Sequence, residues 1–194
     1  LPFLLLERTY ISDREFQKCL TIVAAPGARK KIEHLCEIAY PGSLENILSK
    51  ITWNENPQGV TTDGWSWNRF EVNHNDAVDP FGYSFESSSG AKFVHSGDSG
   101  PCEPLYDAIS KTDLAIIEMG IPEWVPSDEH HKPSDIQALS EQYPNTNFIV
   151  THTFIDCKDS QHPTITSNEF PNHPSNVLHA PDKYVINWNG KWFF

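Results

Sequence analysis

The chain is poor in basic residues. Over 194 residues it carries 14 Lys and Arg against 26 Asp and Glu, which gives a formal net charge of −12 at pH 7. Its longest basic run is Arg29-Lys30-Lys31. Because nucleic-acid backbones are bound by clustered cations, this composition weakens the case for a nucleic-acid partner. It does not exclude RNA, since bound divalent metals reverse the field at a local site.

Paired cysteines and long apolar runs are also missing. The four cysteines have no Cys-x-x-Cys spacing, so neither a zinc ribbon nor a disulfide framework is indicated. No apolar run is long enough to span a membrane, and the opening Leu1–Leu6 lacks the length and basic lead of a signal peptide. With 38% hydrophobic residues the chain can bury one sizeable core. We therefore expect a single domain over residues 1–194, in the cytoplasm, where thiols stay reduced.

Strands and helices alternate along the second half of the chain, a pattern typical of a layered α/β domain. Short apolar or alternating runs predict strands over residues 20–24, 47–53, 65–72, 81–86, 92–95, 114–118, 147–151 and 184–188, the last followed by a hairpin strand. Helical spacing predicts helices over residues 26–39, 103–110 and 134–143. Ser134 is the expected N-cap of the last helix.

One carboxylate stands on a glycine turn directly after an apolar strand. The run Phe93-Val94-His95-Ser96-Gly97-Asp98-Ser99-Gly100-Pro101 places Asp98 at the carboxyl end of its strand. Open sheets gather their chemistry at this end, and a rigid carboxylate there can bind a cation. Gly, Asp and Ser also dominate ordinary turns for conformational reasons. This motif alone therefore leaves a site and a plain turn equally open.

Two histidines follow other predicted strands. His74 comes after the run 65–72, and His152 ends the apolar run that starts at Phe148. A single histidine in such a place is more often a packing residue than a ligand. Three strand ends that deliver His, Asp and His form a more specific pattern, because imidazole with a carboxylate suits zinc, manganese or iron.

These segments, taken in order, resemble the metallo-β-lactamase superfamily. The match runs from His74 through the Ser-Gly-Asp-Ser turn at Asp98 and His131 to Thr151-His152. It is most similar to the branch of ribonuclease Z and the small phosphodiesterases, where a Ser-Gly-Asp-Thr turn, a histidine before a helix and a Thr-His strand end occur in this order. The resemblance implies an α/β fold, an αββα sandwich of two mixed β-sheets with outer helices.

The strongest signature of that family, His-x-His-x-Asp-His, does not occur in these 194 residues. In the family it supplies four ligands and precedes the segments found here. The opening Leu1–Leu6 resembles the stretch that follows it, and the chain starts with Leu and has Met119 as its one methionine. We therefore expect the amino-terminal part of the fold to be missing. An unpaired sheet edge would then favour a homo-oligomer or aggregation.

The resemblance implies a dinuclear centre with two divalent metals, zinc in the first place, with manganese and iron as alternatives. His74 would bind one metal, His152 the other, and Asp98 would bridge them and so count as catalytic too. A histidine before the helix would protonate the leaving group, a role that suits imidazole near neutral pH. His131 is preferred over His130, because the residues after it match the family's step into the helix.

The implied function is metal-dependent hydrolysis of a phosphodiester or related ester by a metal-activated water. The acidic charge favours a small substrate over folded RNA. The alternative is a non-catalytic binding or subunit protein that lacks the amino-terminal ligands. Glu118, at a strand end, would either orient a ligand or be simply solvated. Three histidines in a Pro-rich stretch are expected to be exposed, with a contribution to a substrate lid left open: His162, His173 and His179.

Overall fold

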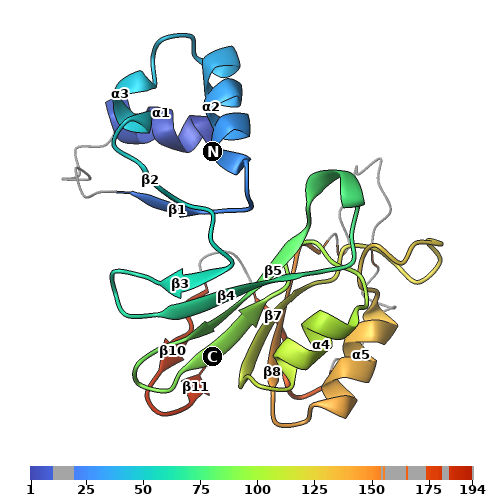
Figure 1. Ribbon diagram of the computed structural model, residues 1–194. Helices are drawn as coiled ribbons and strands as arrows, with labels where there is room; N and C mark the ends of the chain where they lie inside the picture. Colours follow the sequence, from blue (N-terminus) through green and yellow to red (C-terminus); the bar gives the residue numbers. More distant parts are fainter. Residues whose placement is uncertain (11–19, 154, 156–164, 166–173, 181–183, 194) are drawn as a thin grey trace. The chain divides into compact units, whose positions relative to one another are not determined.

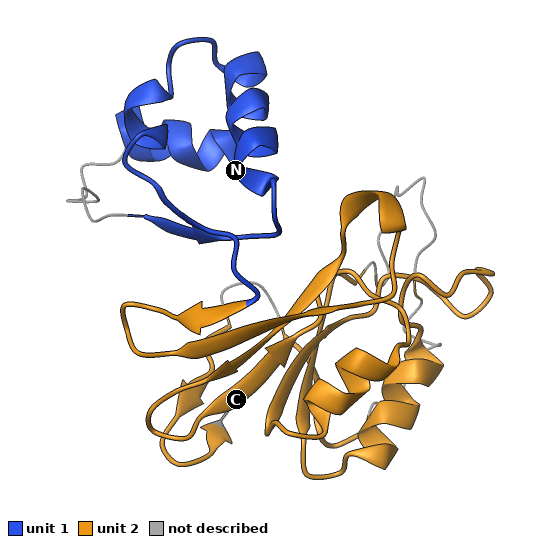
Figure 2. Cartoon of the chain, in the orientation of Figure 1, with its two compact units in different colours: residues 1–57 blue, residues 58–194 orange. Residues whose placement is uncertain are grey.

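The computed structural model describes residues 1–10, 20–153, 155, 165, 174–180 and 184–193 (Figure 1). The chain forms two compact units, residues 1–57 and residues 58–194 (Figure 2). The expectation of a single domain over residues 1–194 stays a prediction.

Unit 1 is a small α/β layer in which two short strands pair in parallel. Its elements are α1 (Pro2–Tyr10), β1 (Thr21–Val23), α2 (Ala28–Ala39), α3 (Glu45–Leu48) and β2 (Thr52–Asn54). The helix α2 begins after Gly27, whose φ of 82° is one that glycine adopts without strain. Four buried side chains form the core of the unit: Leu5, Cys36, Leu44 and Ile51.

Unit 2 is built on a seven-stranded mixed sheet with the order β3-β4-β5-β6-β7-β8-β9. The strands are β3 (Gln58–Val60), β4 (Ser66–Glu71), β5 (Phe81–Glu86), β6 (Lys92–His95), β7 (Leu114–Glu118), β8 (Asn147–Thr151) and β9 (Val177–His179). Pairing is antiparallel from β3 to β6 and parallel from β6 to β9. A separate hairpin joins β10 (Asn187–Trp188) to β11 (Trp192–Phe193).

Two helices cover one face of this sheet, α4 (Glu103–Ile109) and α5 (Pro133–Gln142) (Figure 1). Alternate residues of β7, such as Ala115 and Ile117, point toward them and are fully buried. They pack with Leu105 and Ile109 of α4 and with Ile136 of α5 in one apolar core. This burial fixes the register of the strands, because a slip by one residue would turn the apolar set away from the helices.

The direction of the strands brings several strand ends to one edge of the sheet. β6, β7 and β8 run parallel, and β4 runs in the same direction as β6 because two antiparallel pairings separate them. Their carboxyl ends therefore meet at a common edge, which we call the carboxyl edge. A short 3-10 helix, η1 (Asp76–Val78), lies in the loop that leaves β4 there.

The expected α/β class is confirmed, and most predicted elements are present within a residue or two. The strand predicted over residues 47–53 is wrong in its first half: residues 45–48 form α3, because Leu44, Ile47 and Leu48 pack on the core of unit 1 at helical spacing. Ser134 is not an N-cap. The helix α5 starts one residue earlier, at Pro133, where the fixed φ of proline suits the first helical position.

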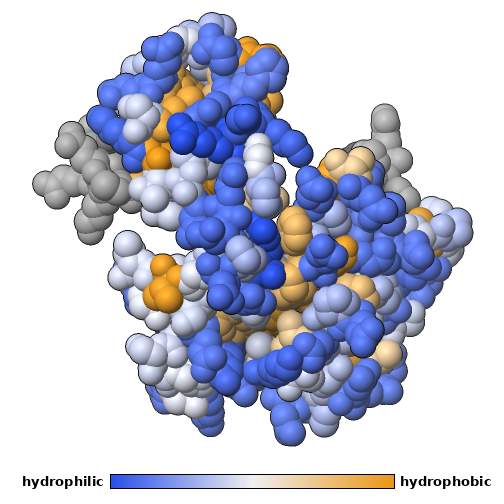
Figure 3. All heavy atoms as spheres, in the orientation of Figure 1, coloured by the Kyte–Doolittle hydropathy of each residue, from blue (hydrophilic) through white to orange (hydrophobic). Residues whose placement is uncertain are grey.

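Four short elements were not expected from the sequence: α1, β3, η1 and β9. No helix in the described part of the chain combines the length and the apolar character that crossing a bilayer takes. The face of the molecule seen in Figure 3 is dominated by hydrophilic residues, in agreement with the acidic composition.

Candidate active site

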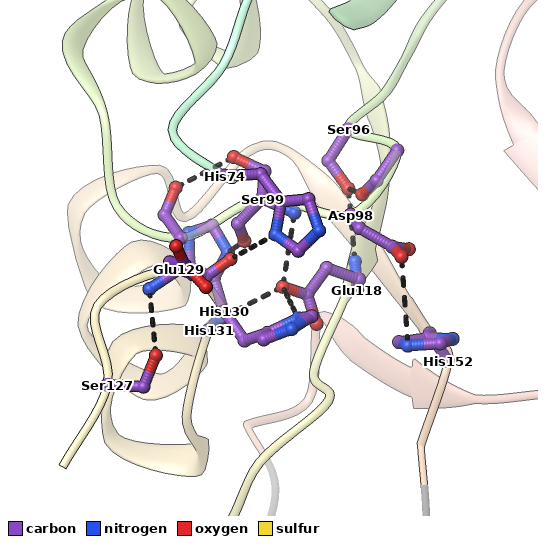
Figure 4. A network of polar contacts seen from close by, with 12 residues as sticks. His74, Ser96, Asp98, Ser99, Glu118, Ser127, Glu129, His130, His131 and His152 are labelled. Carbon is purple, nitrogen blue, oxygen red and sulfur yellow. Dashed lines mark hydrogen bonds and ion pairs between the residues drawn. The ribbon is translucent and has the colours of Figure 1, made fainter. Parts of the chain in front are cut away.

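Five polar side chains meet at the carboxyl edge of the sheet (Figure 4). Three follow the strands β4, β6 and β8, one ends β7, and one lies in the loop before α5. They are His74, Asp98, Glu118, His130 and His152. The structure thus brings together all three predicted metal ligands, with two further groups between them.

His74 is held by the loop that precedes α5. Its Nδ1 lies 3.1 Å from the carbonyl oxygen of Glu129. Its ring centre is 4.9 Å from that of His130, at an angle of 70°. If Nδ1–H donates to this carbonyl, Nε2 keeps its lone pair, which is the usual arrangement of a histidine that binds a metal.

Asn73, the neighbour of His74, connects its own loop by hydrogen bonds to two others, the turn after Asp98 and the loop before α5. Its side-chain amide donates to the carbonyl oxygen of Asp128 at 2.8 Å, and its own carbonyl accepts from the Gly100 N–H at 2.7 Å. A Cβ on Gly100 would collide with the backbone carbonyl of Asp128. These contacts hold the Asp98 turn, the His74 loop and the His130 loop together. At Gly100, where the first and third of them meet, only glycine fits.

Asp98 and His152 face each other across the edge. Oδ2 of Asp98 lies 4.0 Å from Nε2 of His152, and both side chains are about half exposed. The turn before Asp98 uses Gly97 with a φ of 65°, and His152 itself has a φ of 54°, an uncommon conformation for a residue with a side chain. Such local strain concentrates at functional sites. Two ligand atoms of one zinc ion lie at most about 4 Å apart, so this pair can share a cation.

Glu118 is the buried centre of the network. Its side chain is 1% exposed, and Oε1 accepts from the Ser99 N–H at 3.2 Å and from the His131 N–H at 3.0 Å. The Nδ1 of His130 lies 3.0 Å from the same oxygen. The other oxygen, Oε2, is buried and has no hydrogen-bond partner within the described residues. Burial raises the pKa of Glu118 to about 8, although the donors from His131 and Ser99 act in the opposite direction.

The two adjacent histidines have different surroundings. His130 is partly exposed, and its ring centre is 6.0 Å from that of His152. His131 is fully buried, with Nδ1 2.5 Å from the Ser99 carbonyl oxygen and its ring tilted against Tyr106. Burial lowers the pKa of both imidazoles, and for His130 the neighbouring His74 lowers it further. His130, not the preferred His131, therefore lies among the candidate ligands.

Gly120 leaves the space in which this cluster fits. A Cβ at this position would lie 2.8 Å from Oε2 of Glu118, 3.1 Å from Nδ1 of His130 and 3.2 Å from Cδ2 of His152. Three side chains of the network thus close over a backbone position without a side chain. A substitution would have to push at least one of them aside, so glycine here keeps the carboxylate and the two rings together.

The donor set suits a divalent metal, but the ligand shells are incomplete. His74, Asp98 and His152 are the ligand types that zinc, manganese and iron prefer. No group of three His, Cys, Asp or Glu within the described residues is already at metal-binding spacing. Three ligands shared by two ions would also leave each ion short of the three or four that zinc takes. His74, Asp98 and His152 therefore fit part of the ligand set of a metal centre, and further ligands are needed to complete it.

Other candidates from the sequence lie elsewhere. His179 ends β9, and its Nε2 lies 2.9 Å from Oγ1 of Thr153, next to His152. His162 and His173, which were expected to be exposed, lie outside the described residues. A surface cleft of about 720 Å³ lies between β3–β6 and α4, and none of the five clustered side chains lines it.

Sequence reasoning missed Asn73 and Gly120 and left Glu118 undecided. Asn73 and Asp128 are 55 residues apart in the sequence, so no local sequence pattern predicts their contact. The Gly120-Ile121-Pro122 step after a buried strand was a usable signal, because glycine at a strand end often marks a close approach of neighbouring groups.

No protein-family model matches the chain, and no curated protein matches it. Solved structures do match. A possible metal-dependent hydrolase from Veillonella parvula has a TM-score of 0.64 and 14% identity, over 86% of this chain and 66% of its own length. The metallo-β-lactamase fold protein YhfI from Bacillus subtilis has a TM-score of 0.59 and 12% identity, over 90% of this chain and 65% of its own. A long form of ribonuclease Z from yeast has a TM-score of 0.56 and 14% identity, over 76% of this chain and 25% of its own.

These identities show the fold alone. The chain has the metallo-β-lactamase fold, and it spans less than two thirds of the length of each of these three structures.

Proposed function

We propose that this chain carries part of the active site of a metal-dependent hydrolase that cleaves phosphodiester or related ester bonds. The observation that supports it is the meeting of His74, Asp98 and His152 at one sheet edge, beside the buried Glu118 and its partly exposed partner His130. Proteins that share the fold include a possible metal-dependent hydrolase and a ribonuclease Z, which favours this reaction class for the present chain.

His74, Asp98 and His152 would hold two divalent metals, zinc first, with manganese and iron as alternatives. When bound, such metals lower the pKa of a water and stabilise the charge that develops on the attacked ester. Further ligands would have to come from outside the three named here. The 194 residues hold no His-x-His-x-Asp-His run to supply them.

The side chains of this chain would orient the substrate and move one proton. His130 is the proposed proton donor to the leaving group, because it faces the candidate ligands, whereas His131 is buried against Ser99. Glu118 would orient His130 through Nδ1, which leaves Nε2 as the nitrogen that carries the transferred proton. Burial lowers the pKa of His130, so the ring must gain a proton before it can donate one to the leaving group.

The second candidate is a non-catalytic binding or subunit protein with this fold. It is favoured by the incomplete ligand set, since no group of three ligands at metal-binding spacing is found in the described part. A small ester substrate and a homo-oligomer are parts of the main proposal.

Metal binding by the purified chain tests the proposal. After dialysis, the purified chain should retain much less than two tightly bound zinc ions. In a chelator competition assay, His152→Ala and Asp98→Asn should each lower the zinc affinity about 10–100-fold. His34→Ala, an exposed histidine of α2, is the matched control and should change nothing. Two tight zinc ions per chain would show that ligands have been missed. Equal zinc affinity in all four proteins would overturn the metal site.

Hydrolysis of bis(4-nitrophenyl) phosphate with added zinc or manganese separates the two candidate functions. A hydrolase should release 4-nitrophenolate, and His130→Ala should slow the release while zinc affinity is kept. Zinc binding at the same residues without any release would favour the binding protein.

A further inference from the structure

Two loops frame the carboxyl edge, and each exposes one large apolar side chain. We call residues 73–80, after β4, and residues 120–131, between β7 and α5, the rim loops. Val78 on the first is 58% exposed, and Trp124 on the second is 68% exposed. In Figure 1 the loop between β7 and α5 (yellow) projects outward from the sheet. An aromatic side chain exposed on a loop beside a candidate site is available to a ligand, and aromatic rings contribute strongly to the energetics of binding interfaces.

The Trp124 loop is held at both ends. Next to Trp124, the Glu123 carboxylate accepts from the backbone N–H of Ser134 at 2.6 Å and from its hydroxyl at 2.9 Å. At the other end, the carbonyl oxygens of Asp128 and Glu129 are bound by Asn73 and His74.

The middle of the loop is fixed as well. The Val125 N–H donates to the Pro122 carbonyl at 3.1 Å, and a second turn follows at Ser127. Pro122 and Pro126 flank the tryptophan and fix two further φ angles. A loop held in this way presents its side chain at a low entropic cost, which is how aromatic residues serve as anchors in binding.

Trp124 is also near the cluster along the chain. It is four residues from Gly120, whose Cβ position touches Glu118, His130 and His152. Consecutive Cα atoms are 3.8 Å apart, so the Trp124 backbone lies within about 15 Å of Gly120. An indole ring spans roughly half of that distance, so a substrate somewhat larger than its scissile ester can reach both places.

The charge of the rim loops limits the substrate. Residues 73–80 and 120–131 contain no Lys or Arg. They contain five exposed carboxylates: Asp76, Asp79, Glu123, Asp128 and Glu129. These carboxylates disfavour a polyanion at the rim, whereas a neutral or singly charged ester is opposed less.

We infer that the substrate is an ester with at most one negative charge that carries an aryl or other flat apolar group, and that Trp124 contacts this group. Trp124 is thus a specificity-determining residue. This inference rests on the proposed function and deepens it, because it separates the part of the substrate that reacts from the part that is recognised.

The test compares three phosphate probes with the full chain in the presence of zinc. Bis(4-nitrophenyl) phosphate and diethyl phosphate carry one charge each and differ in their aryl groups, and adenosine triphosphate is a polyanion with a flat base. Dissociation constants from ligand-observed NMR should rank the aryl diester at least 10-fold tighter than the other two. Trp124→Ala should remove about 5–10-fold of that affinity, and Trp124→Phe should keep most of it.

Phe3→Ala, a 70% exposed aromatic of α1, is the matched control and should bind like the unchanged chain. Because Trp124 is exposed, its variants should keep the circular dichroism spectrum of the fold. Equal binding of the aryl and ethyl diesters, or unchanged aryl binding in Trp124→Ala, overturns the role of Trp124 and leaves ester binding standing. If no phosphate ester binds with zinc or manganese, the proposed function fails and this inference fails with it.

Discussion

The helix-covered face of the seven-stranded sheet and its carboxyl edge are built by opposite means. Under α4 and α5, apolar side chains such as Phe148 and Ile136 are fully buried, and their attraction has no preferred direction. At the edge a few polar groups are held by hydrogen bonds, which are directional. Oε1 of Glu118 alone lies within hydrogen-bond distance of three nitrogen atoms. The face therefore supplies stability, and the edge holds the candidate site.

Two adjacent residues lie on either side of this division. His131 belongs to the buried region, where it contacts Ser99 and Tyr106. His130 belongs to the edge, where it contacts His74 and Glu118. Substitutions in the two regions should therefore have separable effects on unfolding and on metal or substrate binding.

The largest effect on stability is expected from the face. Phe148→Ala removes a fully buried ring of the core and should lower the free energy of unfolding by about 3–5 kcal/mol. Urea denaturation measures this loss, and Val185→Ala, a 69% exposed position, should change it by less than about 0.5 kcal/mol. The zinc affinity of the folded variant should stay unchanged. A parallel loss of zinc affinity would mean that face and edge are not separable.

Glu118→Ala should come next, because this residue belongs to both regions. Its removal leaves the N–H groups of Ser99 and His131 without their acceptor and should cost about 2–4 kcal/mol in the same urea assay. Zinc affinity should fall as well, since the loops that carry Asp98 and His130 lose their common anchor. A variant as stable as the unchanged chain would show that water replaces the carboxylate and that the network is not structural.

Glu118→Gln is the control for the charge of this group. The folded pKa of about 8 is above the value of 4.5 for a free glutamate, so the folded state holds the proton more tightly than the unfolded state. The stability due to this group is fully present below pH 4.5 and is lost as the pH rises through about 8, at roughly 1.4 kcal/mol per pKa unit. Glu118→Gln should remove this slope from urea midpoints measured between pH 5 and 8. An unaltered slope would assign it to other groups.

His131→Ala should destabilise the chain by about 2 kcal/mol without changing zinc affinity. The buried ring is lost and the carbonyl of Ser99 is left unpaired. His131→Gln, which keeps a donor, should recover part of the loss. If zinc affinity fell in both variants while stability held, His131 and not His130 would belong to the edge.

His130→Ala should have the smallest effect on stability, below about 1 kcal/mol, because its ring is partly exposed. Its effect should fall on catalysis, with turnover of bis(4-nitrophenyl) phosphate lowered about 100-fold or more. Added imidazole should restore part of this rate, which a purely structural role would not permit. Loss of zinc binding in this variant would instead make His130 a ligand.

Much of the fold and part of the site could be predicted from the sequence. Asp98, His74 and His152 each follow an apolar strand, and strand ends that run in one direction must meet at one edge. The preference for His131 over His130 rested on the residues that follow His131, and the sequence does not reveal which of the two rings packs against Tyr106. Asn73 was missed for a similar reason, since its partners lie far away in the chain.

The register of β7 has a consequence for how the length of this protein can change. Ile117 and Met119 point into the core, and Glu118 between them reaches the edge network. Insertion or deletion of a single residue within β7 would exchange these positions, and a carboxylate would then replace an apolar side chain in the core. The rim loops carry no such alternation. Natural variants that differ in length should therefore differ in residues 76–79, while the strands behind them keep a constant number of residues.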